Sequence, residues 1–166
     1  MLKEEVWLMV YDMLKMCVSL CFNIINICFG GKLPPFGSAA VIVEDNEQYL
    51  VVELPRKRLT LPGGFMNWRE NPQQAAEREG KEETGLTLKA GNLISFYSCP
   101  STSWWNMSNL SFVFEAKVVG GQLRKNMEGH PRWVTEEELR QRLDKHTLSI
   151  FEDYQEYRLK KNIHAA

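Results

Sequence analysis

The sequence predicts a mixed α/β sandwich of the α+β class, preceded by an apolar helix. Three observations lead to this prediction: short β-branched runs bounded by turn residues, helical segments opened by capping residues, and no regular strand–helix–strand alternation. The 166 residues are 44% hydrophobic and 25% charged, which suits one globular domain with an appendage. We expect an N-terminal helical extension at residues 1–31 and the globular domain at residues 36–166.

The charge balance argues against one broad class of partner. Twenty Lys and Arg against 21 Asp and Glu give a net charge of −1. Nucleic-acid binding depends on basic surfaces that contact the phosphate backbone. We therefore expect no DNA partner, and the balance also weighs against a long RNA substrate.

Residues 4–29 are predicted to form one long helix that does not span a membrane. The longest uncharged stretch, residues 16–31, is shorter than the roughly 20 residues that a bilayer requires. Polar residues recur at spacings of three and four and form one narrow stripe: Asp12, Lys15, Ser19, Asn23 and Asn26. The apolar remainder needs a cover from the domain, from a second copy or from a membrane surface. We expect a homodimer, with peripheral membrane contact as the alternative.

The cysteine pattern indicates a reducing compartment. Cys17, Cys21, Cys28 and Cys99 form no C-x-x-C pair, and the three histidines are too scattered to complete a zinc site. Free thiols among apolar residues behave as small hydrophobic side chains. We expect reduced, buried cysteines in a cytoplasmic protein.

The other elements follow from alternation, turns and caps. Strands are expected at 37–44 and 47–54, joined as a hairpin, and at 92–98, 110–119 and 132–134. Helices are expected from the capping box at 135–138 through residue 143, and again after residue 147. A further helix at 72–84 is indicated by Asn71 as N-cap, Pro72 at the first position and Gly85 as the terminator.

This helix at 72–84 is unusual in carrying acids on its apolar side. At about 100° per residue, Glu79, Glu82 and Glu83 share one arc with small apolar residues. The opposite, solvated face is predicted to consist of Gln74, Glu77, Arg78 and Lys81. Crowded carboxylates repel one another, and a divalent cation with hard oxygen ligands removes that repulsion. Upstream, Gly63–Gly64 allows close backbone approach, so the pattern suits a metal ion held against a polyphosphate.

The same segment resembles the signature of the Nudix hydrolases, G-x5-E-x7-R-E-U-x-E-E-x-G-U, in which U is a bulky aliphatic residue. Every fixed position matches, at Gly64, Glu70, Arg78, Glu79, Glu82, Glu83, Gly85 and Leu86. One position departs, because Gly80 stands where an aliphatic residue is usual. A helical glycine costs roughly 0.5–1 kcal/mol relative to alanine and removes a packing side chain.

The resemblance implies an α/β/α sandwich with a mixed sheet, and a Mg²⁺-dependent enzyme in which Mn²⁺ can substitute. Such enzymes hydrolyse a pyrophosphate bond in a nucleoside diphosphate derivative by attack of water on phosphorus. Glu79 and Glu83 look like the principal metal ligands. Glu82 and the carbonyl oxygen of Gly63 look like further ligands.

The resemblance implies supporting roles for other charged residues. Arg78 looks like the residue that orients the acids, and Glu70 like a partner of the loop or of outer-sphere water. Family members take the general base from the signature acids, Glu82 and Glu83 here, or from a later loop. In that loop Glu128 is our candidate, and His130 is the second choice.

Substrate-binding residues are predicted only from side-chain types that suit a nucleotide. Trp104 and Trp105 could stack on a base, although packing into an interface explains them equally well. Arg56 and Arg58, with Lys57 between them, could contact a phosphate or form a solvated loop. We expect a nucleotide of the ADP-ribose type. The alternatives are nucleoside triphosphate sanitation, removal of RNA 5′ phosphates, a non-catalytic nucleotide-binding module and a membrane-associated scaffold.

Overall fold

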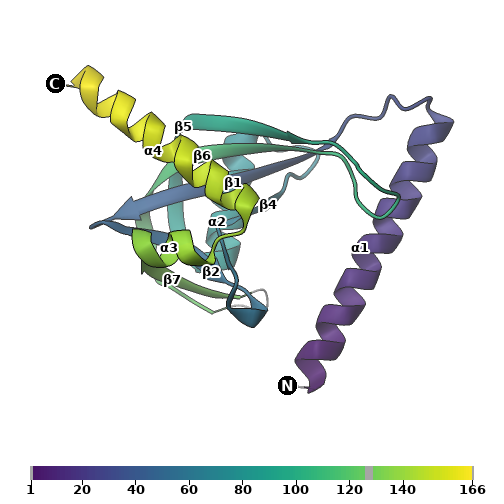
Figure 1. The fold of residues 1–166 in the computed structure, drawn as a ribbon, viewed down its shortest axis with the longest axis horizontal. Helices are drawn as coiled ribbons and strands as arrows, with labels where there is room; N and C mark the ends of the chain where they lie inside the picture. The colour runs from purple at the N-terminus through teal and green to yellow at the C-terminus, as the bar shows by residue number, and fades with distance from the viewer. Residues whose placement is uncertain (1, 126–128, 166) are drawn as a thin grey trace. The chain divides into compact units, whose positions relative to one another are not determined.

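The computed structural model describes residues 2–125 and 129–165 and divides into two compact units (Figure 1). One unit consists of Met1–Phe36 together with Ser98–Leu110, and the other of Gly37–Tyr97 together with Ser111–Ala166. The first unit contains the predicted N-terminal helix, α1, at Leu2–Cys28. The sequence did not indicate that residues 98–110 would join this helix, because the two segments lie far apart in the chain.

The second unit is built around a seven-stranded sheet in the order β3-β2-β1-β6-β5, with β4 paired to β1 and β7 paired to β2. The strands are β1 (Phe36–Asp45), β2 (Gln48–Glu53), β3 (Leu59–Thr60), β4 (Gly63–Phe65), β5 (Leu86–Cys99), β6 (Asn109–Gly121) and β7 (His130–Thr135). The helices are α2 (Pro72–Thr84), α3 (Glu136–Arg142) and α4 (Lys145–Ala165), with a 3₁₀ turn at Pro55–Lys57. The predicted sandwich is confirmed, with a mixed sheet and helices on both sides.

Two apolar cores lie on opposite faces of the sheet, because alternate side chains of a strand point to opposite faces. Along β1, Val41 and Val43 pack with Ala76 of α2 in one core. Ile42 between them packs with Phe151 of α4 in the other. Figure 1 shows α3 and α4 on one side of the sheet and α2 on the other. Helix α2 thus forms a layer of its own on one face of the sheet.

The segment that carries the glycines and the acids folds as strand, loop and helix. β4 pairs antiparallel with β1, with Ala40 opposite Gly63 and Ala39 opposite Gly64. Helix α2 begins with the predicted capping box at its N-cap Asn71 and ends at Gly85, whose φ is 77°. Both ends of α2 therefore agree with the sequence prediction, because both are set by local residues.

Two elements begin earlier than predicted. β5 starts at Leu86 rather than at residue 92, and its alternate side chains Leu86, Leu88 and Ala90 enter the core beneath α2. Helix α4 starts at Lys145 because the Asp144 carboxylate accepts a 3.0 Å hydrogen bond from the backbone N–H of Thr147. The sequence prediction placed the start of this helix after Thr147 and did not use Asp144 as its cap.

Part of the polar stripe of α1 is covered by other segments of the chain, including the one at 98–110. The Nδ2 of Asn23 donates to the carbonyl oxygens of Trp104 and Asn106, at 3.0 and 3.1 Å. Ser19 is buried, and Asn26 accepts a 3.0 Å hydrogen bond from the N–H of Leu33. Lys15 of the same stripe is exposed, so the stripe is covered only in part.

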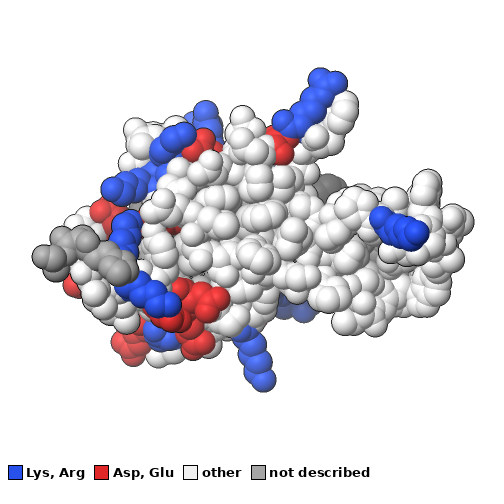
Figure 2. All heavy atoms as spheres, turned by 90° about the horizontal axis from the view of Figure 1, so that it is seen from above, with Lys and Arg blue, Asp and Glu red and all other residues white. Residues whose placement is uncertain are grey.

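The apolar side of α1 is correspondingly exposed in the single chain. Its large exposed residues are Met9, Val10, Met13, Leu14, Met16, Val18, Ile24, Ile25 and Ile27. Cys17, Cys21 and Cys28 are also exposed, so the prediction that they are buried is wrong. Figure 2 shows few charged side chains over the part of the chain that holds α1. Within the described residues, no helix has both the length and the apolar character needed to cross a membrane.

Gly80, the departure from the family signature, is explained by its neighbour across the core. A Cβ built on Gly80 would lie 2.6 Å from Cδ1 of Leu88 and 3.6 Å from Cγ2 of Val41. Gly80 is itself buried within α2. The Leu88 side chain therefore occupies the volume that an aliphatic residue on the helix would fill.

Because Leu88 fills the space beside Gly80, substitutions at these two positions should compensate each other. Gly80→Leu should lower the free energy of unfolding by about 1–3 kcal/mol through overpacking, and Leu88→Ala by about 2–5 kcal/mol through a cavity. The double variant should be destabilised by clearly less than the sum, because each change relieves the other. Urea unfolding of the three variants measures this coupling, and additive effects would contradict the packing described.

Candidate functional site

The candidate site is organised by one arginine that contacts three carboxylates. Arg78 of α2 donates from Nε to Oε1 of Glu70 at 2.7 Å and from Nη2 to Oε2 of Glu70 at 3.0 Å. Its Nη1 donates to Glu79 at 2.7 Å and to Glu82 at 3.1 Å. Its Nη2 also donates to the carbonyl oxygen of Phe65 at 2.9 Å, which ties α2 to β4. A planar guanidinium with five donors suits this forked arrangement.

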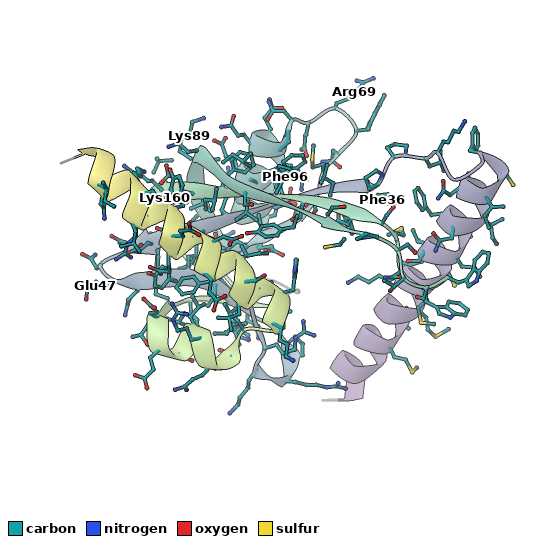
Figure 3. All side chains as sticks on the ribbon, turned by 45° about the horizontal axis from the view of Figure 1, so that its top comes forward. Phe36, Glu47, Arg69, Lys89, Phe96 and Lys160 are labelled. Carbon is teal, nitrogen blue, oxygen red and sulfur yellow. The ribbon has the colours of Figure 1, made fainter. Side chains whose placement is uncertain are left out.

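Glu70 is held by the loop that joins β4 to α2, in which Figure 3 labels Arg69. The backbone N–H and the Nδ2 of Asn67 each donate to the Glu70 carboxylate at 3.0 Å. The Arg78 guanidinium, followed by these Asn67 hydrogen bonds, lowers the pKa of Glu70 from 4.5 to about 2. The same contact with Glu70 raises the pKa of Arg78. The sequence analysis missed Asn67; its amide three residues before a signature acid was the available signal.

The two glycines of β4 bring backbone close to two other signature acids. The N–H of Gly63 donates to Oε2 of Glu83 at 2.9 Å. A Cβ on Gly64 would lie 2.5 Å from the carboxylate of Glu79, so a side chain there would displace this carboxylate. Because β4 is paired to β1, these backbone atoms are held by the sheet. The glycine backbone of β4 therefore lies close against Glu79 and Glu83 of α2.

The carboxylates of this site have the chemistry of a hard-cation site but are gathered here around Arg78. Within residues 2–125 and 129–165, no three His, Cys, Asp or Glu side chains stand close enough together to hold a metal ion. Carboxylate and carbonyl oxygens are nevertheless the ligands that Mg²⁺ and Mn²⁺ prefer. Glu82, with 59% of its side chain exposed, is the acid most open to an incoming ligand. The donor set thus fits such an ion by its chemistry.

One part of the helical-wheel prediction is wrong. Arg78 and Glu77 were placed on the solvated face of α2, yet both are half-buried. Arg78 turns towards the acids, with 25% of its side chain exposed, and Glu77 accepts a 3.0 Å hydrogen bond from the N–H of Ala90. A wheel places the Cα atoms, whereas these long side chains reach around the helix to partners that the sequence does not reveal.

The basic residues predicted for phosphate binding lie on a turn at the edge of the second unit. Arg56 and Arg58 are exposed, and Arg56 has a left-handed φ of 63°. The carbonyl oxygen of Lys57 between them accepts a hydrogen bond from Nε of Arg142 at 3.0 Å. The turn is thereby fixed against α3.

The other predicted residues lie in the first unit, at the start of β7 or outside the described residues. Trp104 and Trp105 are about half exposed and belong to the unit that contains α1. His130 is exposed at the start of β7, opposite Glu53 of β2. Glu128 lies outside the described residues. Substrate contact by these residues stays a prediction.

Comparison with known proteins places this geometry in a family. The model of the NUDIX domain matches residues 34–154, which includes the sheet, the β4–α2 segment and most of α4. The match covers well over half of the chain. The protein therefore belongs to the NUDIX domain family.

The individual relatives that match share only a modest fraction of identical residues with this chain. The chain is 34% identical over 87 residues to an ADP-ribose pyrophosphatase of Methanocaldococcus jannaschii, a match that covers 50% of this chain and 51% of that enzyme. It is 28% identical over 115 residues to a MutT-like protein of Streptomyces ambofaciens, covering 66% and 71% of the two chains. Among solved structures, a NUDIX hydrolase from Nitrosomonas europaea has a TM-score of 0.65 at 26% identity, covering 74% of this chain and 89% of that one.

The contact between Arg78 and Glu70 predicts a pH-dependent contribution to stability. Because the pKa of Glu70 falls from 4.5 to about 2 on folding, its stabilisation is fully present above pH 4.5 and is lost as the pH falls towards 2. Glu70→Gln removes this contribution at neutral pH. The difference in free energy of unfolding between wild type and variant should shrink between pH 5 and about pH 2.

Urea unfolding across that pH range measures the difference. Glu152→Gln, which alters an exposed carboxylate on α4, is the matched control. A wild-type advantage over Glu70→Gln that stays constant down to pH 2 would contradict the assigned contact.

Proposed function

We propose that this protein hydrolyses a pyrophosphate bond in a nucleoside diphosphate derivative of the ADP-ribose type, with Mg²⁺ as its cofactor. The observation that carries the proposal is the Arg78 cluster, in which Glu70, Glu79 and Glu82 surround one guanidinium beside the β4 glycines. An acidic site next to backbone free of Cβ suits an anionic phosphate bridged by a cation.

Glu79, Glu82 and Glu83 are the proposed ligands of the cation, with the carbonyl oxygen of Gly63 as a fourth. A bound Mg²⁺ neutralises charge on the phosphoryl oxygens and lowers the pKa of the attacking water, and Mn²⁺ can replace it. The protein's part is to hold these oxygens in place. Arg78 does so by anchoring to Glu70, which the loop at Asn67 fixes in turn.

The substrate class is supported by the matched relative named as an ADP-ribose pyrophosphatase, and the match spans about half of that enzyme. The second candidate is sanitation of nucleoside triphosphates, favoured by the relative named MutT-like. A non-catalytic nucleotide-binding role is disfavoured because every signature acid is present. Arg56 and Arg58 are proposed to contact substrate phosphate, and Trp104 and Trp105 to stack on the base.

The central test is a carboxylate-to-amide change that preserves shape. Glu83→Gln should lower kcat for ADP-ribose hydrolysis with Mg²⁺ by at least about two orders of magnitude, the scale of losing a charge that stabilises the transition state. Glu77→Gln, on the same helix, is the matched control and should keep kcat within a few-fold. Near-normal turnover of Glu83→Gln, with the circular dichroism of wild type, would refute the proposal.

Glu128 is our proposed general base in preference to His130. Glu128 stands just before β7 in the sequence, where a loop that reaches the acidic face of α2 is the expectation on which this proposal rests. Glu128→Gln should therefore reduce kcat by about 10²-fold or more, the range that general-base catalysis contributes. His130→Ala should leave kcat close to wild type. A large loss confined to the histidine variant would reverse the assignment.

The exposed side of α1 is proposed to pair with a second copy of the chain. The 27-residue helix is about 40 Å long, and its uncovered apolar surface favours association. We expect sedimentation velocity to show a dimer, and Ile24→Lys combined with Ile27→Lys to give a monomer of unchanged activity. A wild-type monomer in detergent-free buffer would contradict the homodimer, and liposome binding by that monomer would support peripheral membrane contact instead. A cytoplasmic location stays a prediction from the cysteine pattern.

A further inference from the structure

A hollow of about 580 Å³ lies where the C-terminal end of α2 meets the end of β6, beside the candidate metal-binding acids. It is lined by Lys81, Glu82, Gly85, Gly121, Gln122 and Arg124. Only Glu82 belongs to the carboxylate cluster described above. The remaining lining residues have no place in that cluster and need a separate explanation.

Two left-handed glycines hold the hollow in shape. Gly85 and Gly121 have φ values of 77° and 84°. A Cβ on Gly121 would lie 2.5 Å from the carbonyl oxygen of Gly85, and a Cβ on Gly85 would lie 2.5 Å from that of Gln122. The N–H of Arg124 donates to the carbonyl oxygen of Thr84 at 2.9 Å. The end of β6 is therefore fixed against the end of α2, and the hollow exists before any ligand arrives.

Two cations, Lys81 and Arg124, line the hollow. Lys81 and Arg124 are both exposed, and neither has an ion pair among the residues that the structure describes. Glu82, which also lines the hollow, forms a 3.1 Å contact with Arg78. Two exposed cations that line one hollow, beside a candidate metal ligand, form a place for an anion. Phosphate groups have this chemistry.

We infer that this hollow binds a phosphate group of the substrate. The inference rests on the proposed pyrophosphate hydrolysis and names a subsite for it. Lys81 supplies a mobile point charge, and Arg124 supplies a planar fork suited to two phosphate oxygens. The anion would thus lie against Lys81 and Arg124, next to Glu82, which lines the same hollow and would help to hold the cation.

A different role for the same cations makes a different prediction. Positive charges at a helix C-terminus also stabilise the helix dipole. In that case Lys81→Gln and Arg124→Gln would lower the melting temperature without affecting any anion. Binding of an anion therefore separates the two roles.

Inorganic phosphate in metal-free buffer is the probe, because without a divalent cation the acidic cluster repels it. NMR titration of the full chain should move the amide signals of Gly85, Gly121 and Gln122. Combining Lys81→Gln with Arg124→Gln should weaken phosphate binding by about fivefold or more, as expected for two partly exposed charge contacts. The matched control combines Arg140→Gln with Lys160→Gln, which removes the same charge on the α3 and α4 side (Lys160 is labelled in Figure 3).

The outcomes are distinct. Phosphate shifts in these amides that the double variant loses and the control keeps would support the subsite, whether or not ADP-ribose is hydrolysed. Absent shifts, or shifts unchanged in the double variant, would overturn it even in an active enzyme. A protein that binds phosphate here yet hydrolyses neither ADP-ribose nor nucleoside triphosphates would refute the proposed function alone.

Discussion

The contact on which the site depends is the fork between Arg78 and Glu70. Through it, one guanidinium on α2 is anchored to the preceding loop and still reaches Glu79 and Glu82. Without the anchor, acids at spacings of three and four on one helix would repel one another. The lowered pKa of Glu70 and the raised pKa of Arg78 express the same coupling. Folding thus gathers negative charge at one place and stabilises it with a single cation.

The rest of the second unit supports this arrangement. β4 is only three residues long, yet its pairing with β1 sets the glycine backbone against Glu83 and Glu79. Leu88 fills the volume left by Gly80, so α2 packs on the sheet without the aliphatic residue that the family usually has there. At the other end of α2, the close contacts of Gly85 and Gly121 fix the end of β6 against the helix. They shape the hollow that Lys81 and Arg124 line.

Local signals in the sequence predicted the parts of the structure that local contacts determine. Asn71, Pro72 and Gly85 gave both ends of α2, and the turn after residue 44 gave the β1–β2 hairpin. Long-range contacts were not predictable in this way. Asn23 of α1 binds carbonyl oxygens about 80 residues further along the chain, so the side of α1 that is exposed could not be inferred from its polar stripe. Asn67 and the inward turn of Arg78 were missed for the same reason, since both depend on a partner rather than on a pattern.

The central claim, that the acids gathered by Arg78 form a divalent-cation site, is tested most directly by metal-dependent thermal stability. A ligand that binds only the folded state raises the melting temperature. We expect Mn²⁺ and Mg²⁺ to raise the melting temperature of wild type and of Glu77→Gln, but not that of the variant combining Glu79→Gln with Glu83→Gln. An equal rise in all three proteins would contradict the account, because the cation would then bind elsewhere.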